Sequence, residues 1–155
     1  MSPEVRAMLV AKDIDPEAAL LLADSIGQFE SRNVPTAVQV GGGPGKGLYQ
    51  YEAGSAQSAY NRAKTAQRAL KIYLDPKIDY ADALDSETTW LEKLKKDDFD
   101  ASTLTAQQQT DLFILDQLMD VNNFTDTVRK ISQEVSGGMA YQQGTVSQLT
   151  HDYWG

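Results

Sequence analysis

A glutamate and a serine at the end of an apolar stretch are the residues of this 155-residue chain whose types and spacing favour chemistry. Glu30 and Ser31 close the run "DPEAALLLADSIGQFES", and the segment that follows contains five glycines before the next carboxylate, Glu52. A glycine-rich loop beside a carboxylate is a linker, a phosphate cradle or part of a shaped active site. Each alternative requires different flanking residues.

The phosphate-cradle alternative fails on the residues themselves. A Walker loop needs the pattern G-x-x-x-x-G-K-[ST] after a strand. Val40 stands where the first glycine is required, and Lys46 is followed by Gly47 in place of a hydroxyl residue. The dinucleotide pattern G-x-G-x-x-G is also absent. A flexible linker is disfavoured because the loop continues into the apolar and aromatic stretch "GLYQYE". The sequence therefore favours part of an active site.

Two short segments carry a resemblance to a known family. Glu30-Ser31 followed by "GLYQ" at residues 47–50 resembles the lysozyme-like superfamily, in particular lytic transglycosylases and goose-type lysozymes, which have Gly-Leu-Met-Gln at the second position. Tyr49 replaces the methionine here. The run "GGGPGKGLYQYE" is similar to one that recurs in small tailed-phage proteins. The resemblance is strongest over residues 13–74.

The resemblance implies that Glu30 is the catalytic residue. Cleavage of a glycosidic bond requires a carboxylic acid that protonates the leaving oxygen. In a lytic transglycosylase the same residue then acts as base, so that a hydroxyl of the sugar closes an anhydro ring and no second carboxylate is needed. No metal or cofactor is implied.

The resemblance also implies a set of substrate-binding residues. Glycine allows the backbone to approach a sugar closely, while amide and aromatic side chains hydrogen-bond to or stack on its rings. Ser31 is also expected to support the helix end, and Glu52 is either a second carboxylate or an ion-pair partner. The predicted substrate-binding residues are Ser31, Gly47, Tyr49, Gln50 and Glu52.

A lysozyme-like fold makes a geometric prediction about this region. Gln50 and Glu30 must point into one cleft, within about 10 Å of each other, because a sugar ring and its glycosidic oxygen fit between them. Leu48 is then buried, and the glycines before it form the rim of the cleft.

Other candidate residues are less specific. Active transglycosylases usually place a tyrosine opposite the glutamate, and no motif chooses among the candidates. His151, the single histidine, is predicted to be a surface or packing residue, since one histidine does not make a metal site. The segment 153–155, "YWG", is predicted to anchor on the core of the chain or on a neighbouring subunit. The candidate tyrosines are Tyr73, Tyr80, Tyr141 and Tyr153.

Composition excludes several classes of partner. The formal net charge of −8 opposes attraction to nucleic acid or anionic lipid. No apolar run approaches the roughly 20 residues that span a bilayer, so membrane insertion is not expected. The first residues do not resemble a secretory signal peptide. There are no cysteines, and an apolar content of 41% is typical of a globular domain.

Periodicity predicts an almost entirely helical chain. A helix over 16–31 is capped by Asp15, and one over 105–120 begins with Thr105 and Gln108 in capping-box spacing. Leu112, Leu115 and either Leu118 or Met119 are its predicted core stripe. Further helices are predicted over 56–74, 86–96, 125–135 and 145–154. Only residues 36–40, "TAVQV", alternate as a strand would.

These observations predict an all-α fold, with residues 1–155 forming a single lysozyme-like domain that carries a glycine-rich active-site loop. The resemblance implies a virion-associated phage protein that cleaves peptidoglycan glycan strands during genome delivery at the host cell envelope. Its partners would be the glycan strand and other phage virion proteins. The alternative is a structural tail or internal virion protein with the same fold and no catalytic activity.

Overall fold

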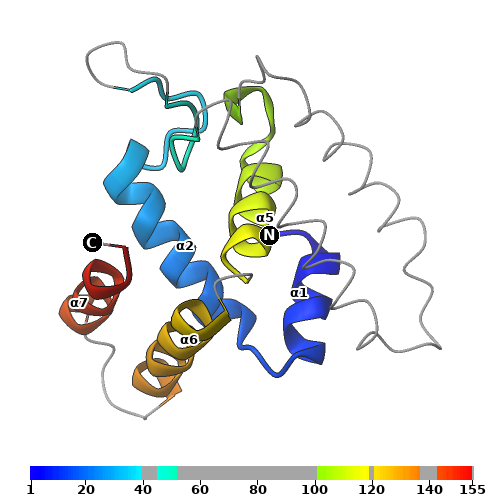
Figure 1. Cartoon of the computed structure of the whole chain (residues 1–155), viewed down its shortest axis with the longest axis vertical. Helices are drawn as coiled ribbons and strands as arrows, with labels where there is room; N and C mark the ends of the chain where they lie inside the picture. Colours follow the sequence, from blue (N-terminus) through cyan, green and yellow to red (C-terminus); the bar gives the residue numbers. More distant parts are fainter. Residues whose placement is uncertain (40–44, 52–100, 119–120, 137–142, 155) are drawn as a thin grey trace.

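The chain is mainly helical, as the sequence predicts. The structure is a computed structural model that describes residues 1–39, 45–51, 101–118, 121–136 and 143–154 (Figure 1). These ranges contain five α-helices and no strand. None of the described helices is both long and apolar enough to cross a membrane. The predicted helices at 56–74 and 86–96 lie outside the described residues.

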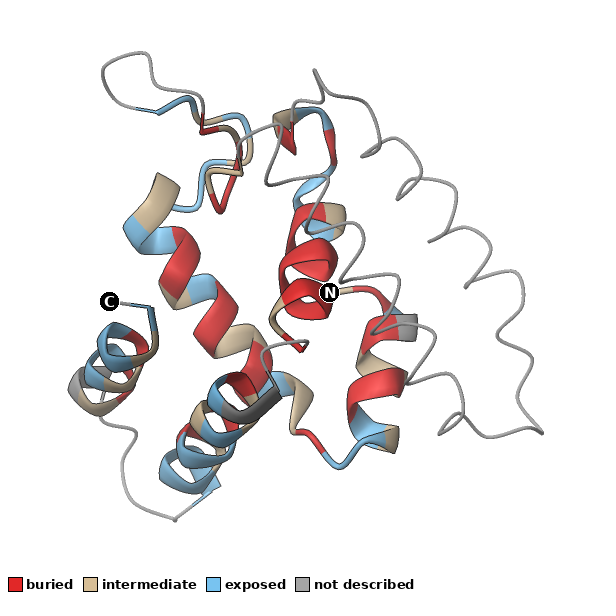
Figure 2. Cartoon of the chain, viewed as in Figure 1, coloured by how far each residue is buried: buried red, intermediate tan, exposed pale blue. Residues whose placement is uncertain are grey.

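Helix α2, Pro16–Ser31, is the central element and forms where the sequence predicts it. The Asp15 carboxylate caps its first turn by accepting hydrogen bonds from two backbone N–H groups. Arg32 caps the C-terminal end of the helix with a left-handed φ of 54°. One face of α2 is buried, and the helix contacts α1, α5, α6 and α7 (Figures 1 and 2). Glu30 thus lies at the end of the helix that organises the core.

Helix α1, Pro3–Ala11, is not among the helices predicted from the sequence. Its N-terminus is capped in the same way as that of α2. The Ser2 side chain accepts a hydrogen bond from the backbone N–H of Val5, and Pro3 occupies the first turn. Val5, Met8 and Leu9 are buried at helical spacing.

Helix α5, Ala106–Gln117, begins with the predicted capping box. Thr105 and Gln108 exchange hydrogen bonds between side chain and backbone at its first turn. The predicted stripe of Leu112, Leu115 and Leu118 is buried. However, every residue from 109 to 116 is buried, so the helix is enclosed around its whole circumference (Figure 2). Four of these eight residues are polar, which a simple apolar stripe does not predict.

Helices α6, Val121–Ser136, and α7, Gln143–Trp154, complete the described core. Both begin before the predicted starts at 125 and 145. Phe124, Val128 and Ile131 of α6 are buried. Tyr153 lies near Phe124, with a ring-centroid distance of 6.2 Å. The end of α7 therefore anchors on the core of its own chain, which was one of the two predicted alternatives. A short 3-10 helix, η2, Ala101–Thr103, precedes α5.

Candidate functional site

The segment 45–51 folds back against residues 37–39 and contributes Gln50 to the candidate site. Gly47 N–H donates to the Ala37 carbonyl over 2.9 Å, and Gln39 N–H donates to the Gly45 carbonyl over 3.0 Å. Only isolated bridges join these residues. The strand suggested for 36–40 is therefore not formed over 36–39, the described part of that range. Each of the two segments makes too few consecutive pairs for a ladder.

Gly47 is required by close packing against α5. Its φ is +82°, and a Cβ atom at this position would lie 2.4 Å from Oε1 of Gln109. A side chain at position 47 would therefore be strained and would displace Gln109. Gly47 does not line the groove that contains Glu30. The geometry gives this residue a structural role, and its substrate-binding role stays a prediction.

The buried side chain of Gln109, which is only 2% exposed, forms hydrogen bonds with three separate segments. Its Oε1 accepts a hydrogen bond from the backbone N–H of Leu48 over 2.7 Å. Its Nε2 donates to the carbonyls of Pro35 and Leu104, each over 3.0 Å. The amide thus uses both its acceptor and its two donors within the protein. This single side chain fixes the segment 45–51 relative to α5 and to the loop after α2.

Two tyrosines of the same segment are also held by polar groups of α5. The Tyr49 hydroxyl lies 3.2 Å from Thr110 Oγ1, and the Tyr51 hydroxyl donates to Asp116 Oδ2 over 2.9 Å. The Tyr49 ring stacks on Phe113 with a centroid distance of 4.2 Å. Tyr49 is 6% exposed and lines a separate hollow, not the groove of Glu30. Its ring is thus part of the core, and its contact with a substrate stays a prediction.

Burial of the Tyr49 hydroxyl makes the stability of the folded chain depend on pH in the alkaline range. Burial is the main cause that raises the pKa of Tyr49 to about 12, and the carboxylates of Asp24 and Asp111 add to it against the hydrogen bond with Thr110. Between pH about 10 and about 12, the unfolded chain releases this proton while the folded chain keeps it. The free energy of unfolding should therefore fall as the pH rises through this window, by about 2 kcal/mol from this group.

The Tyr49→Phe variant should lose less stability than the wild type over the same window. Urea unfolding from pH 9 to pH 12 measures the difference between the two chains. The other tyrosines contribute equally to both. Parallel curves for the two chains would contradict the assignment to Tyr49.

An open groove of about 850 Å³ lies at the end of α2. Both Glu30 and Gln50 line it, as the lysozyme-like prediction requires, and Leu48 is buried as expected, at 7% exposed. The groove contains polar and apolar side chains from the last turn of α2, the following loop and the segment 45–51. Its lining residues are Phe29, Glu30, Ser31, Arg32, Ala37, Val38, Gln39 and Gln50.

Glu30 is held by the indole of Trp154. Trp154 Nε1 donates a hydrogen bond to Glu30 Oε1 over 2.7 Å. The indole contacts Phe113 edge to face, with a centroid distance of 5.6 Å. Since Phe113 also stacks on Tyr49, aromatic contacts connect the segment 45–51 with the partner of Glu30. Among the described residues, Glu30 is the only carboxylate that lines the groove.

Ser31 and Gln50 line the groove while also supporting the backbone. Ser31 Oγ donates to the Gly27 carbonyl over 3.1 Å, which fits the predicted support of the helix end. Gln50 has a φ of 54°, and its Nε2 donates to the Gly47 carbonyl over 2.7 Å. The donor group of this amide is thus used inside the turn. Contact with a substrate remains a prediction for both residues.

The other predicted candidates are placed elsewhere or not described. Glu52, Tyr73, Tyr80 and Tyr141 lie outside the described residues. Tyr153 donates a hydrogen bond to Gln117 on α5 and does not line the groove. His151 is exposed and lies next to Asp152, consistent with a surface residue.

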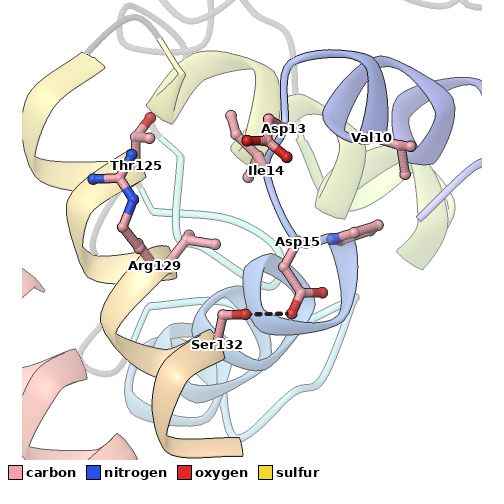
Figure 3. A pocket seen from close by; sticks show the side chains of 9 residues that line it. Val10, Asp13, Ile14, Asp15, Thr125, Arg129 and Ser132 are labelled. Atoms are coloured by element: carbon pink, nitrogen blue, oxygen red, sulfur yellow. Dashed lines mark hydrogen bonds between the residues drawn. The ribbon is translucent and has the colours of Figure 1, made fainter. Parts of the chain in front are cut away.

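A second cavity, of about 420 Å³, lies at the other end of α2, between the α1–α2 connection and α6 (Figure 3). Asp15 Oδ2 accepts a hydrogen bond from Ser132 Oγ over 2.7 Å in this cavity, while its Oδ1 caps α2. Arg129 pairs with Asp126. The bond between Ser132 and Asp15 joins α6 to the start of α2, and the Arg129–Asp126 pair lies within α6. Both contacts give these polar groups a structural role. The length of α2 separates this cavity from Glu30 by about 20 Å.

Two aromatic residues near Glu30 were not found from the sequence. Phe29 precedes Glu30 and is 63% exposed at the groove, and Trp154, the partner of Glu30, is 38% exposed. Phe29 falls off the apolar stripe of α2, and a large aromatic residue on the outer face of a helix is the signal that marks it. For Trp154 the sequence carries no such signal, because the contact with Glu30 joins residues that are 124 positions apart.

No protein-family model, curated protein or solved structure matches this chain. The candidate site therefore rests on the residues and geometry described above.

Proposed function

We propose that this chain is a lysozyme-like protein that cleaves glycosidic bonds of peptidoglycan, with Glu30 as general acid and then base. The observation that carries the proposal is the position of Glu30 at the end of α2, in a groove that also contains Ser31 and Gln50. This is the arrangement that the Glu-Ser and Gly-Leu-Tyr-Gln segments imply. The volume of the groove is in the range of ligand sites.

In the proposed reaction Glu30 first gives up a proton and later takes one back. The protonated carboxyl gives its proton to the glycosidic oxygen as the bond to the anomeric carbon breaks. The resulting carboxylate then accepts a proton from a hydroxyl of the same sugar, whose oxygen attacks the anomeric carbon and closes an anhydro ring. No water is consumed. This path needs only one carboxylate, whereas hydrolysis uses a second one in most glycosidases.

The proposed setting is a phage particle that opens the cell wall locally during genome delivery. The support is the resemblance of "GGGPGKGLYQYE" to a run in small tailed-phage proteins. Digestion of purified sacculi by the wild-type chain tests the activity. Anhydro-muropeptides are the expected products, whereas reducing-end products would indicate hydrolysis, and no product over a range of pH and salt would overturn the enzymatic proposal.

The exposed aromatic ring at the groove gives a further prediction. Phe29 offers an apolar surface on which a sugar ring can stack. We expect Phe29→Ala to weaken binding to peptidoglycan fragments about tenfold, the equivalent of roughly 1.4 kcal/mol. Stability should change by less than about 0.5 kcal/mol because the side chain is exposed. Titration with soluble glycan fragments, followed by NMR, measures the affinity.

Val10→Ala is the matched control for Phe29→Ala. Val10 is 61% exposed, and it lines the cavity at the other end of α2. The substitution should leave the affinity for the fragments unchanged. Equal affinities of the Phe29→Ala variant and the wild type would exclude the ring from glycan binding.

A second candidate function is a structural virion protein whose lysozyme-like site is not used. Phe29 and Val38 both line the groove, and each is 63% exposed. Exposed apolar side chains that gather in one area favour contact with another protein. In the assembled particle, a partner that covers the groove of Glu30 would favour the structural function, and an open groove would favour the enzyme.

A further inference from the structure

We propose that Trp154 is a positioning residue that determines which oxygen of Glu30 carries the catalytic proton. This inference rests on the proposed function and adds a residue from α7 to the site. Its basis is the hydrogen bond of 2.7 Å from Trp154 Nε1 to Glu30 Oε1.

The chemistry of the two groups fixes the direction of this hydrogen bond. An indole N–H is a donor only, so the oxygen that faces it must act as the acceptor. A protonated carboxyl has one O–H and one carbonyl oxygen. The carbonyl oxygen is the stronger acceptor of the two, so the bond from Trp154 to Oε1 favours the form in which Oε2 carries the proton. Trp154 thereby assigns Oε2 as the atom that donates to the glycosidic oxygen and later accepts the proton of the sugar hydroxyl.

The core holds the indole in place. Trp154 packs edge to face on Phe113, which is fully buried and stacks on Tyr49. The Trp154 ring is therefore positioned by contacts that do not depend on Glu30. A side chain supported on one side by the core orients its partner before substrate binds, which is the requirement for a preorganised site.

The resulting site has two parts that are remote in sequence. Glu30 comes from the last turn of α2, and its orienting donor comes from the last turn of α7, 124 positions later. These helices contact each other in the structure. Displacement of α7 would leave Glu30 in the groove without its hydrogen-bond donor.

The first arm of the test measures catalysis on purified sacculi. Trp154→Phe keeps an aromatic ring on Phe113 but removes the N–H. The expected result is a product-release rate about tenfold to a hundredfold lower, the loss typical of a misoriented catalytic group, with KM nearly unchanged. Gln148→Ala is the matched control, because it removes an exposed hydrogen bond within α7, from Gln148 to Asp152, without touching Glu30, and its rate should stay close to that of the wild type.

The second arm is independent of catalysis. The chain contains two tryptophans, and the indole N–H signal that disappears from the ¹H–¹⁵N spectrum of the Trp154→Phe variant belongs to Trp154. In the Glu30→Ala variant this signal should shift and its N–H should exchange faster with solvent. An unchanged signal would overturn the inference.

The two arms separate the possible failures. A wild-type chain that releases no product overturns the proposed function and, with it, the catalytic role of Trp154, while the spectrum still reports the contact itself. An active wild type together with equal rates for Trp154→Phe and Gln148→Ala overturns the positioning role alone.

Discussion

Glu30→Gln is expected to abolish the release of anhydro-muropeptides from purified sacculi. General acid and base catalysis by one side chain contributes about 10² to 10⁴-fold to a rate, and an amide can perform neither step. The amide oxygen of the substituted side chain can still accept the hydrogen bond from Trp154, so the geometry of the groove should persist. Glu30 is partly exposed in the last turn of α2, and the substitution should therefore change stability little.

The measurement compares initial rates of product release, with thermal unfolding as the check on folding. Glu134→Gln is the matched control, because it removes the same charge from an exposed position on α6. Its rate should equal that of the wild type. A Glu30→Gln variant that retains most of the wild-type rate would remove Glu30 from the mechanism.

Gln109→Ala is expected to cost about 3 kcal/mol of unfolding free energy. The substitution removes the partner of the Leu48 N–H and of the Pro35 and Leu104 carbonyls. A buried polar group left without a partner costs about 1 to 3 kcal/mol, and water entering the vacated space offsets part of the total. The segment 45–51 should lose its fixed position against α5, and with it the position of Gln50 in the groove.

Urea denaturation measures this loss, and proteolysis within residues 45–51 reports the release of the segment. Gln107→Ala serves as the control, since Gln107 is an exposed residue in the first turn of the same helix. Its stability should stay within about 0.5 kcal/mol of the wild type. If Gln109→Ala and Gln107→Ala have equal stabilities, then Gln109 does not anchor the segment.

Local signals in the sequence predicted two of the helices that begin with a cap. The Asp15 cap and Pro16 place the start of α2, and the capping box of Thr105 and Gln108 places the start of α5. The helix α1 carries an equivalent signal in Ser2 and Pro3 but was not predicted. Such signals act over three or four residues, so they are readable without knowledge of the fold.

The candidate site was predicted in part. Glu30 and Gln50 line the same groove, as predicted. The motif segments were enough to identify these two residues. Gly47 and Tyr49 were expected to face a substrate, and in the structure one packs on Gln109 and the other on Phe113. A tyrosine in a loop carries no local signal that tells whether its ring faces solvent or the core.

The sequence by itself determined that the chain is mainly helical, where α2 and α5 begin, and that a carboxylate ends α2 ahead of a glycine-rich loop. The tertiary structure decided which polar residues of α5 are buried, which side of the segment 45–51 faces the core, and that Trp154 is the partner of Glu30. The physical reason is the separation along the chain over which each kind of interaction acts. Caps and periodicity are set by neighbours along the chain, whereas burial and pairing depend on segments that only packing brings together.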